Sequence, residues 1–580
     1  MRMRLAVGIA VLTGALARAQ ERVIVHEVDE RQVCSVKVTP FSGSTRPGGL
    51  GFVLVDAQNH DGKPHALQVD VQSWNRSTQD ISLHRSLMLG PEERGRFFLP
   101  LPNASGGYRL TVVVDATTHT DNLHLAPNRG FTALLVSDRP QVAPQALAIV
   151  QATAGPARNA SEKQQVVACN TIDLPADWRC FTGFDMVIVD GRSRLPDEAQ
   201  QALRRYAFAG GTVLVGSPRS LPAGALRDRL EGSDLPATVA HGLGFVVATG
   251  ALEIDPAEMR DLFAALPAGR PGSGRALWPA PEPLLAQQDV PGLDEAPVLV
   301  FLCVILLFAA LAGPVNFFLL RRWRRPLLAL VTVPALGFGT TLLMLGYALV
   351  HDGFGVRGVV RTWTLLDQRN HEAVTIGART LFAGLAPDAL QIDNDAMVLA
   401  PAAFHRPDSR RPDRWHFDGD SNRLDGGVLP SRTTSVLLDA RQGVARERLR
   451  ARLRPDGALD LLTDGGVVPT GTVLLRDPDG GYWAGEGLRL ARCTDAEAGQ
   501  VLDGWISEVR EHRIDTGVGH VEASLELLVH RLVRSSELPP GSYCTRVAAT
   551  PWAPEHGLRA DYDVAQHYVF GLLAAEDFLR

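Results

Sequence analysis

The chain has 580 residues, too many for a single hydrophobic core, so several domains are expected. Its net charge of −6 and isoelectric point near 6.3 argue against the basic surface typical of nucleic-acid-binding proteins. A mean hydropathy of +0.01 fits soluble domains joined to a small membrane part. The composition therefore predicts no nucleic-acid partner.

The N-terminus has the three parts of a secretory signal peptide. Arg2 and Arg4 supply positive charge, residues 5–16 are apolar, and Ala17-Arg18-Ala19 matches a small-residue cleavage site. Residues 1–19 are therefore predicted to direct export, with an uncleaved anchor as the alternative. Most of the chain is then expected to lie outside the cytoplasm.

Residues 20–140 have the pattern of an all-β domain. Short apolar or alternating runs are separated by turns rich in Gly, Pro, Asn and Asp, which favours strands. The runs lie at 32–38, 51–55, 67–74, 96–101 and 108–115. Short strands at this spacing predict an immunoglobulin-like β-sandwich.

Residues 141–290 predict a parallel α/β domain. Compact apolar runs at 146–150, 165–169, 185–189 and 212–215 are interpreted as strands, with a further one at 244–248. Residues 196–209 have apolar positions at helical spacing between Pro196 and Gly210-Gly211, which are helix start and stop signals. Buried strands alternating with helices predict a parallel sheet covered on both faces.

A family resemblance rests on this block. The segments Asp185-Met-Val-Ile-Val-Asp-Gly191, Tyr206-Ala-Phe-Ala-Gly-Gly211 and Thr212-Val-Leu-Val-Gly216 resemble the class I glutamine amidotransferase-like fold. Membrane-anchored bacterial members of that group, of uncharacterised function, carry an adjacent helical hairpin, to which residues 313–322 are similar. The resemblance covers residues 145–350 and implies an amidotransferase-like domain.

The predicted sheet would bring a few polar and small residues to one edge. Ligands of open parallel sheets bind beyond the carboxyl ends of the strands. The candidate ligand-binding residues at that edge are Gln151, Asp190, Gly191, Gly216 and Ser217. The alternative is that Asp and Gly serve the backbone of the turns.

Catalysis of the amidotransferase type requires a nucleophile on a tight, glycine-flanked turn and a histidine to activate it. Cys169 and Cys180 lack glycine neighbours, and Ser217 lacks a second glycine on its far side. His241 is the only histidine between residues 141 and 290. The sequence therefore predicts no catalytic residue and no enzyme.

Residues 296–350 contain two apolar runs joined by the Arg-rich segment 321–325. Each run is about long enough to cross a ~30 Å hydrocarbon core, and Arg-rich loops stay on the cytoplasmic side. Two transmembrane helices with a cytoplasmic loop are therefore predicted. Asn316 would form a hydrogen bond across the pair or to a partner helix.

Residues 356–580 predict a second, extracytoplasmic β-rich domain with helical additions at 496–512 and 523–533. The predicted strands lie at 357–366, 373–376, 435–438, 459–462, 472–475 and 488–490. Residues 418–422 have the alternating oxygen ligands of a calcium loop but lack its glycine and closing Glu. No metal site and no cofactor are predicted.

The cysteines leave two alternatives open. An exported chain permits disulfides, and Cys169 with Cys180 and Cys493 with Cys544 are the candidate pairs. Buried free thiols are the alternative, because connectivity cannot be read from sequence.

Taken together, these features predict a non-enzymatic interaction protein of a bacterial cytoplasmic membrane, with both large regions extracytoplasmic. Its expected partners are the lipid bilayer and other membrane or envelope proteins, with a role in assembling or regulating an envelope or transport-associated complex. The alternatives are an envelope hydrolase or amidase that uses the α/β cleft, and a receptor for a small ligand or carbohydrate.

Overall fold

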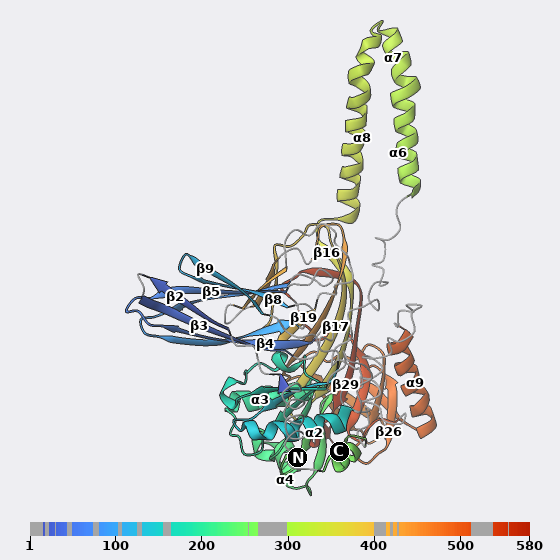
Figure 1. Ribbon diagram of the computed structural model, residues 1–580. Helices are drawn as coiled ribbons and strands as arrows, with labels where there is room; N and C mark the ends of the chain where they lie inside the picture. Colours follow the sequence, from blue (N-terminus) through green and yellow to red (C-terminus); the bar gives the residue numbers. More distant parts are fainter. Residues whose placement is uncertain are drawn as a thin grey trace.

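The computed structural model describes most of the chain. The described residues are 16–17, 22–28, 31–42, 49–73, 81–102, 107–123, 130–154, 164–252, 255–264, 298–399, 413–417, 422–425, 429–511, 537–554 and 556–579. They form four sheets and a long helical hairpin that projects from the rest (Figure 1). A multidomain chain with mixed α/β and β-rich regions, as predicted, is confirmed.

The N-terminal strands build two sheets that share one core. The first has the order β2-β3-β4-β7 and the second the order β18-β21-β20-β6-β5-β8-β9. Side chains of β8 alternate between buried and less buried, as expected for strands with one face on a core. The strands are β2 (Arg22–Val28), β3 (Arg31–Phe41), β4 (Leu50–Asn59), β5 (His65–Ser73), β6 (Ile81–Leu89), β7 (Arg94–Pro102), β8 (Tyr108–Val114), β9 (Thr117–Leu123), β18 (Ala389–Ile392), β20 (Asp413–Phe417) and β21 (Asn422–Asp425).

Three strands of the second sheet come from beyond the hairpin, which the predicted domain boundaries did not anticipate. β20 pairs with β6 in parallel, with Trp415 opposite Leu83. Val36, Val69 and Trp415 lie in the same apolar cluster. Pairing between segments so far apart leaves no local pattern in the sequence.

The next region is a mostly parallel α/β sheet with the order β1-β11-β10-β12-β13-β15-β14, in which β14 alone runs antiparallel to its neighbour. Its strands are β1 (Leu16–Ala17), β10 (Thr132–Val136), β11 (Gln165–Cys169), β12 (Met186–Val189), β13 (Thr212–Val215), β14 (Ala237–His241) and β15 (Gly244–Ala248). Of the predicted signal peptide, residues 16 and 17 are described, and they form β1.

Helices cover both faces of this sheet. They are α2 (Ala143–Ala154), α3 (Asp197–Phe208), α4 (Ala225–Glu231) and α5 (Pro256–Ala264). In β12, Val187 shares a core with α3, whereas its neighbour Ile188 shares the opposite core with α2 and α5. Strand side chains alternate between faces, so a continuous apolar run is needed when both faces are covered.

The prediction of a strand at 146–150 is wrong. This run lies in α2, and the strand that precedes α2 in the sheet is β10, which lies within the residues predicted as the sandwich domain. A short apolar run does not distinguish a buried helix from a buried strand. Here the run is rich in Ala, a strong helix former.

The C-terminal region is dominated by one sheet with the order β19-β22-β17-β16-β29-β28-β25-β26-β27-β24-β23-β30. The predicted strands are confirmed, and several are longer than predicted. They are β16 (Val356–Asp367), β17 (Glu372–Ala383), β19 (Ala396–Leu399), β22 (Thr434–Val444), β23 (Arg448–Leu453), β24 (Leu459–Asp464), β25 (Thr472–Arg476), β26 (Tyr482–Glu486), β27 (Arg489–Cys493), β28 (Ser542–Val547), β29 (Ala560–Leu572) and β30 (Phe578–Leu579). The predicted helix at 496–512 is α9 (Asp495–Glu511), and the one at 523–533 lies outside the described residues.

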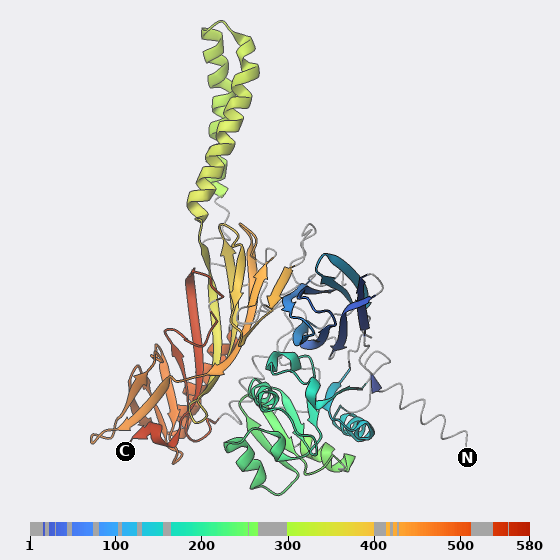
Figure 2. The same ribbon diagram turned by 90° about the vertical axis from the view of Figure 1, so that its left-hand side faces the viewer.

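The hairpin consists of two long apolar arms (Figures 1 and 2). α6 (Val298–Ala310) continues through the π-helical turn η5 (Leu311–Val315) into α7 (Asn316–Arg322). After the short turn η6 (Pro326–Leu328), α8 (Ala329–Asp352) returns toward the body. Phe301–Arg322 and Ala329–Tyr347 are each long and apolar enough to span a membrane.

Hydrogen bonds join the α/β domain to the N-terminal sheets and to the large C-terminal sheet. The backbone N–H of Leu50 donates to Thr182 Oγ1 at 3.0 Å, and Arg179 donates to the carbonyl of Ala396 at 2.8 Å. Arg204 in α3 donates twice to the Glu372 carboxylate in β17, at 2.8 and 2.7 Å. The three regions outside the hairpin therefore form one connected body.

Candidate functional site

The strand order of the parallel sheet defines where a ligand site is expected. Numbered along the chain, β10, β11, β12, β13 and β15 stand in the order 2-1-3-4-5, which is that of flavodoxin-like sheets. The direction of winding reverses between β10 and β12, and ligands of such sheets bind beyond the carboxyl ends at that point. The polar residues at this edge therefore test the predicted cleft.

Asp190, which follows β12, is already committed to protein partners. Its carboxylate accepts two hydrogen bonds from the Arg139 guanidinium, at 2.7 and 2.6 Å, and one from Ser137 Oγ at 2.9 Å. Burial alone would raise the pKa of Asp190, but the hydrogen bonds from Arg139 and Ser137 outweigh it and hold the pKa below its usual value. The carboxylate is therefore ionised and satisfied.

Gly191 and Gly216 are brought together by close approach of two turns. A Cβ on Gly191 would lie 2.4 Å from the carbonyl carbon of Gly216, and one on Gly216 would lie 2.6 Å from the nitrogen of Gly191. Ser217 caps the short turn η4 (Pro218–Ser220) by accepting a hydrogen bond from the Arg219 backbone. These three residues thus serve the backbone, which is the alternative the sequence left open.

Gln151 does not belong to this edge. It lies on the exposed side of α2, because the run from which its position was inferred is a helix. Its predicted place in a cleft with Asp190 is therefore wrong.

Sequence reasoning missed the residues that complete the edge. Ser137, Asp138 and Arg139 follow β10, and Asp138 accepts hydrogen bonds from the backbone and hydroxyl of Thr171 at 2.9 and 2.7 Å. The signal was available in the apolar run 131–136, which is followed directly by Ser and Asp. The run lies within residues 20–140, where the surrounding strand pattern predicts an all-β domain, so it was not recognised as a strand of the parallel sheet.

All six cysteines are free thiols, so neither candidate disulfide is formed. Cys169 and Cys180 are buried, and burial raises the pKa of both thiols well above the usual value. Cys544 is buried as well, whereas Cys493 is partly exposed. The observed state is the other alternative, free thiols, for both pairs.

The thiols of the α/β domain are also badly placed for catalysis. Cys169 ends β11, while the histidine of the domain, His241, ends β14 at the far edge of the sheet. Burial and the nearby Arg204 charge lower the pKa of His241 to about 4. His241 Nε2 lies 4.0 Å from Glu372, so it belongs to the contact with the large sheet.

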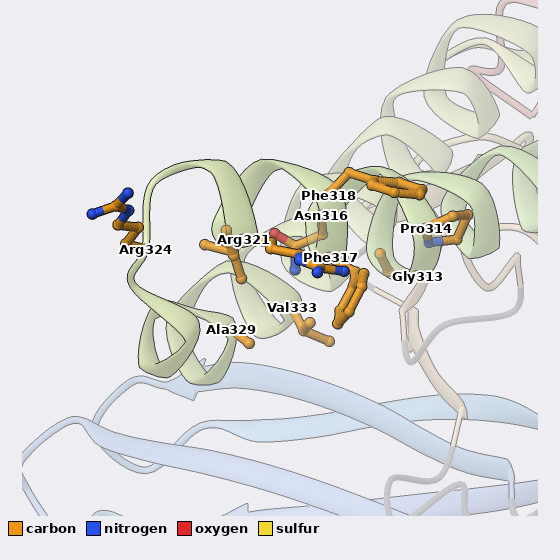
Figure 3. Close-up of a pocket in the computed structure, with 11 residues that line it drawn as sticks. Gly313, Pro314, Asn316, Phe317, Phe318, Arg321, Arg324, Ala329 and Val333 are labelled. Atoms are coloured by element: carbon orange, nitrogen blue, oxygen red, sulfur yellow. The ribbon is translucent and has the colours of Figure 1, made fainter.

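A groove of about 760 Å³ lies between the arms of the hairpin, at the Arg-rich tip (Figure 3). Its walls are apolar and include Gly313, Phe317 and Phe318, while Arg321 and Arg324 line its tip end. Asn316, predicted to bond across the pair or to a partner, accepts a hydrogen bond across the pair from Thr332 Oγ1 at 3.1 Å.

A second cavity, of about 570 Å³, lies between α9 and the strands β25 and β28. Glu486, Trp505 and Arg546 are among its lining residues. The indole N–H of Trp505 is buried and has no hydrogen-bond partner among the described residues. This cavity is polar, whereas the hairpin groove is apolar.

No group of three or more His, Cys, Asp or Glu side chains that could hold a metal occurs in the described part of the chain.

No family model and no curated protein matches the chain. Among solved structures, it is similar to an M1 zinc metallopeptidase from Deinococcus radiodurans (13% identity, 20% of this chain and 25% of that one, TM-score 0.12). It is also similar to a carbohydrate acetylesterase from Xanthomonas citri (11% identity, 73% and 96% coverage, TM-score 0.17). The chain spans about a quarter of the peptidase, and TM-scores this low carry no argument about fold or activity.

Proposed function

We propose that the protein is a membrane-anchored, extracytoplasmic and non-enzymatic interaction protein that assembles or regulates a complex of the bacterial envelope. The observation that carries this proposal is the hairpin. In the most apolar 18-residue stretch of each arm, 6% and 0% of the residues are buried inside the molecule. Burial of apolar surface is worth roughly 25 cal/mol per Å², so arms this exposed favour a bilayer as their surroundings.

The shape of the hairpin supports one orientation. The start of α6 and the end of α8 lie at the same end of the hairpin, on the side of the body, and Arg321, Arg322, Arg324 and Arg325 belong to the opposite end (Figure 1). At ~1.5 Å per residue, the spans of 22 and 19 residues measure about 33 and 28 Å, close to the ~30 Å hydrocarbon core. Arg-rich loops favour the cytoplasm, so the body would lie on the other side.

The interaction role draws on the carboxyl edge of the parallel sheet. A working site of the amidotransferase type needs an activated thiolate, and the raised pKa of Cys169 disfavours one. Asp190 is engaged by Arg139 and Ser137, which favours a structural role for the edge. The amidotransferase-like domain, like the immunoglobulin-like sandwich, would then be a surface for partners.

A receptor for a small polar ligand or carbohydrate is the second candidate. It is favoured by the cavity of about 570 Å³, whose Trp505 carries an unpartnered indole N–H. A thermal-shift screen of the full chain with sugars, repeated on Trp505→Phe, would test it. A shift present in the parent and lost in the variant would favour the receptor.

The main proposal is tested by crosslinking in intact membranes. A photocrosslinker at exposed positions of the body, such as Ile172, is expected to capture defined envelope proteins. The same crosslinker at Phe338, an exposed residue of α8, would report partners within the bilayer. Recovery of the bare protein alone from both positions, at several growth conditions, would contradict an interaction role.

A further inference from the structure

We propose that the groove at the hairpin tip binds one anionic phospholipid, with its phosphate at Arg321 and Arg324 and its acyl chains along the apolar walls. The inference rests on the proposed function, since it requires the hairpin to lie in a bilayer. It deepens that function by naming a lipid class that the anchor would select.

The first arm is irregular where it lines the groove. Pro314 lacks a backbone N–H and cannot continue regular α-helical hydrogen bonding. The chain accommodates it in the π-helical turn η5, a feature that often marks functional sites in helices. Nothing lies within 4 Å of where a Cβ on Gly313 would stand, so the wall there is open.

The walls and the end of the groove differ in chemistry. Phe317 and Phe318 are 61% and 68% exposed, and together with Val333 they supply an apolar surface for acyl chains. Arg324 lies at the tip, and the Arg321 side chain lies near Asn316 and Phe317 (Figure 3). A long apolar wall with a cationic end matches an anionic amphiphile.

No Asp or Glu is among the described residues that line the groove with these two guanidinium groups. A guanidinium presents its N–H donors in a fork that matches phosphate oxygens, and such charge-assisted hydrogen bonds are strong. Arg324 adopts a left-handed φ of 54°, which reverses the chain at the tip. Arg324 from this turn and Arg321 from the last turn of α7 both line the groove.

Charge complementarity favours a lipid over a partner helix as the occupant. A transmembrane helix would fill the apolar walls but would bring no acceptor for two guanidinium groups at their depth. The exposed Trp323 at the same tip is typical of a residue at the headgroup level. An anionic membrane surface also attracts each basic residue by about 1 kcal/mol without any specific site. The experiment must therefore separate this general attraction from binding in the groove.

The chain offers matched controls for that purpose. Arg322 and Arg325 belong to the same basic segment but do not line the groove. The double variant Arg321→Gln/Arg324→Gln therefore has a control of equal charge, Arg322→Gln/Arg325→Gln. Gly313→Leu fills the groove without changing charge, and Gly337→Leu, at an equally open position of α8 outside the groove, is its control.

The measurement is native mass spectrometry of the full chain in detergent, titrated with phosphatidylglycerol or phosphatidylcholine. We expect one phosphatidylglycerol to bind at least tenfold more tightly than phosphatidylcholine. Arg321→Gln/Arg324→Gln and Gly313→Leu should each lose this preference, while both control variants keep it. Inorganic phosphate and the water-soluble glycerophosphoglycerol headgroup should not compete at equal concentration, because they lack the acyl chains.

Two results would overturn the inference: equal loss in the two double Arg variants, which indicates attraction by charge alone, or unchanged preference in Gly313→Leu. Flotation of every variant with phosphatidylcholine vesicles tests the anchor separately. A parent chain that does not float would overturn the proposed function itself, whereas floating without lipid preference would overturn the site alone.

Discussion

The carboxyl edge of the parallel sheet and the tip of the hairpin both present charged side chains beside apolar structure, and they differ in whether those charges have partners. At the sheet edge Asp190 is held by Arg139 and Ser137. At the tip Arg321 and Arg324 line a groove that has no carboxylate among its described lining residues. The polar groups of the sheet edge are thus already paired within the protein, whereas those of the tip line an open groove.

The largest expected effect concerns the hairpin as a whole. Replacing residues 298–352 with a Gly-Ser linker should move the protein from the membrane fraction to the soluble fraction, because the exposed apolar arms are removed. Fractionation followed by immunoblotting measures this. Retention of the shortened chain in carbonate-washed membranes would show that another segment anchors it.

The contact between the α/β domain and the large sheet should be sensitive to acid. Burial lowers the pKa of His241 from 6.5 to about 4, so the unfolded state binds the proton more tightly between these values. Above pH 6.5 His241 is neutral in both states and does not lower the free energy of unfolding. As the pH falls toward 4, protonation of the unfolded state lowers the free energy of unfolding by a total of roughly 3 kcal/mol.

Chemical denaturation of the detergent-solubilised chain at pH 7 and pH 4.5 would measure this loss. His241→Gln should lose less stability over the interval than the parent, and the exposed His60→Gln should behave like the parent. Equal pH dependence in parent and His241→Gln would mean that His241 does not sense the contact.

At the sheet edge, Asp190→Ala should cost about 2 kcal/mol, because Ser137 and Arg139 lose a buried charged acceptor. Ser217→Ala, which removes the cap of the short turn η4, should cost less than about 1 kcal/mol. Thermal denaturation compares the two. A small-molecule stabilisation of the parent that vanishes in Asp190→Ala would instead identify the edge as a binding cleft.

The smallest effect is expected inside the hairpin. The hydrogen bond from Thr332 to Asn316 should contribute about 0.6 kcal/mol, the average for such bonds between membrane helices. A double-mutant cycle of Asn316→Leu and Thr332→Val, measured by SDS titration with circular dichroism, isolates it. Coupling that is absent within error would leave the bond without a role in stability.

Local patterns predicted much of the fold. The sandwich strands, the helix after Pro196, and the apolar arms each carry their own periodicity or length signal. The run at 146–150 failed because five apolar residues fit a buried helix as well as a strand. The pairing of β20 with β6 could not be predicted from local patterns, because the two strands lie on opposite sides of the hairpin in the sequence.

The site was harder to predict than the fold. The sequence located Asp190 and Gly191 at the correct edge, but not the Arg139 side chain that neutralises Asp190, because β10 was assigned to the sandwich. The closeness of Gly191 and Gly216 depends on the packing of two turns, which single-sequence patterns do not encode. The hairpin groove likewise depends on the packing of the two arms, since residues of both line it.

The most direct test of the account is the orientation of the hairpin. Single cysteines can be placed at the tip (Arg325→Cys) and on the body (Ala257→Cys and Gly355→Cys), with Cys303 and Cys493 replaced by Ser. In intact spheroplasts, a membrane-impermeant maleimide should label both body positions. The tip position should be labelled only after the membrane has been opened with detergent. Labelling of Arg325→Cys in intact spheroplasts, with protection of the body positions, would contradict the proposed anchor.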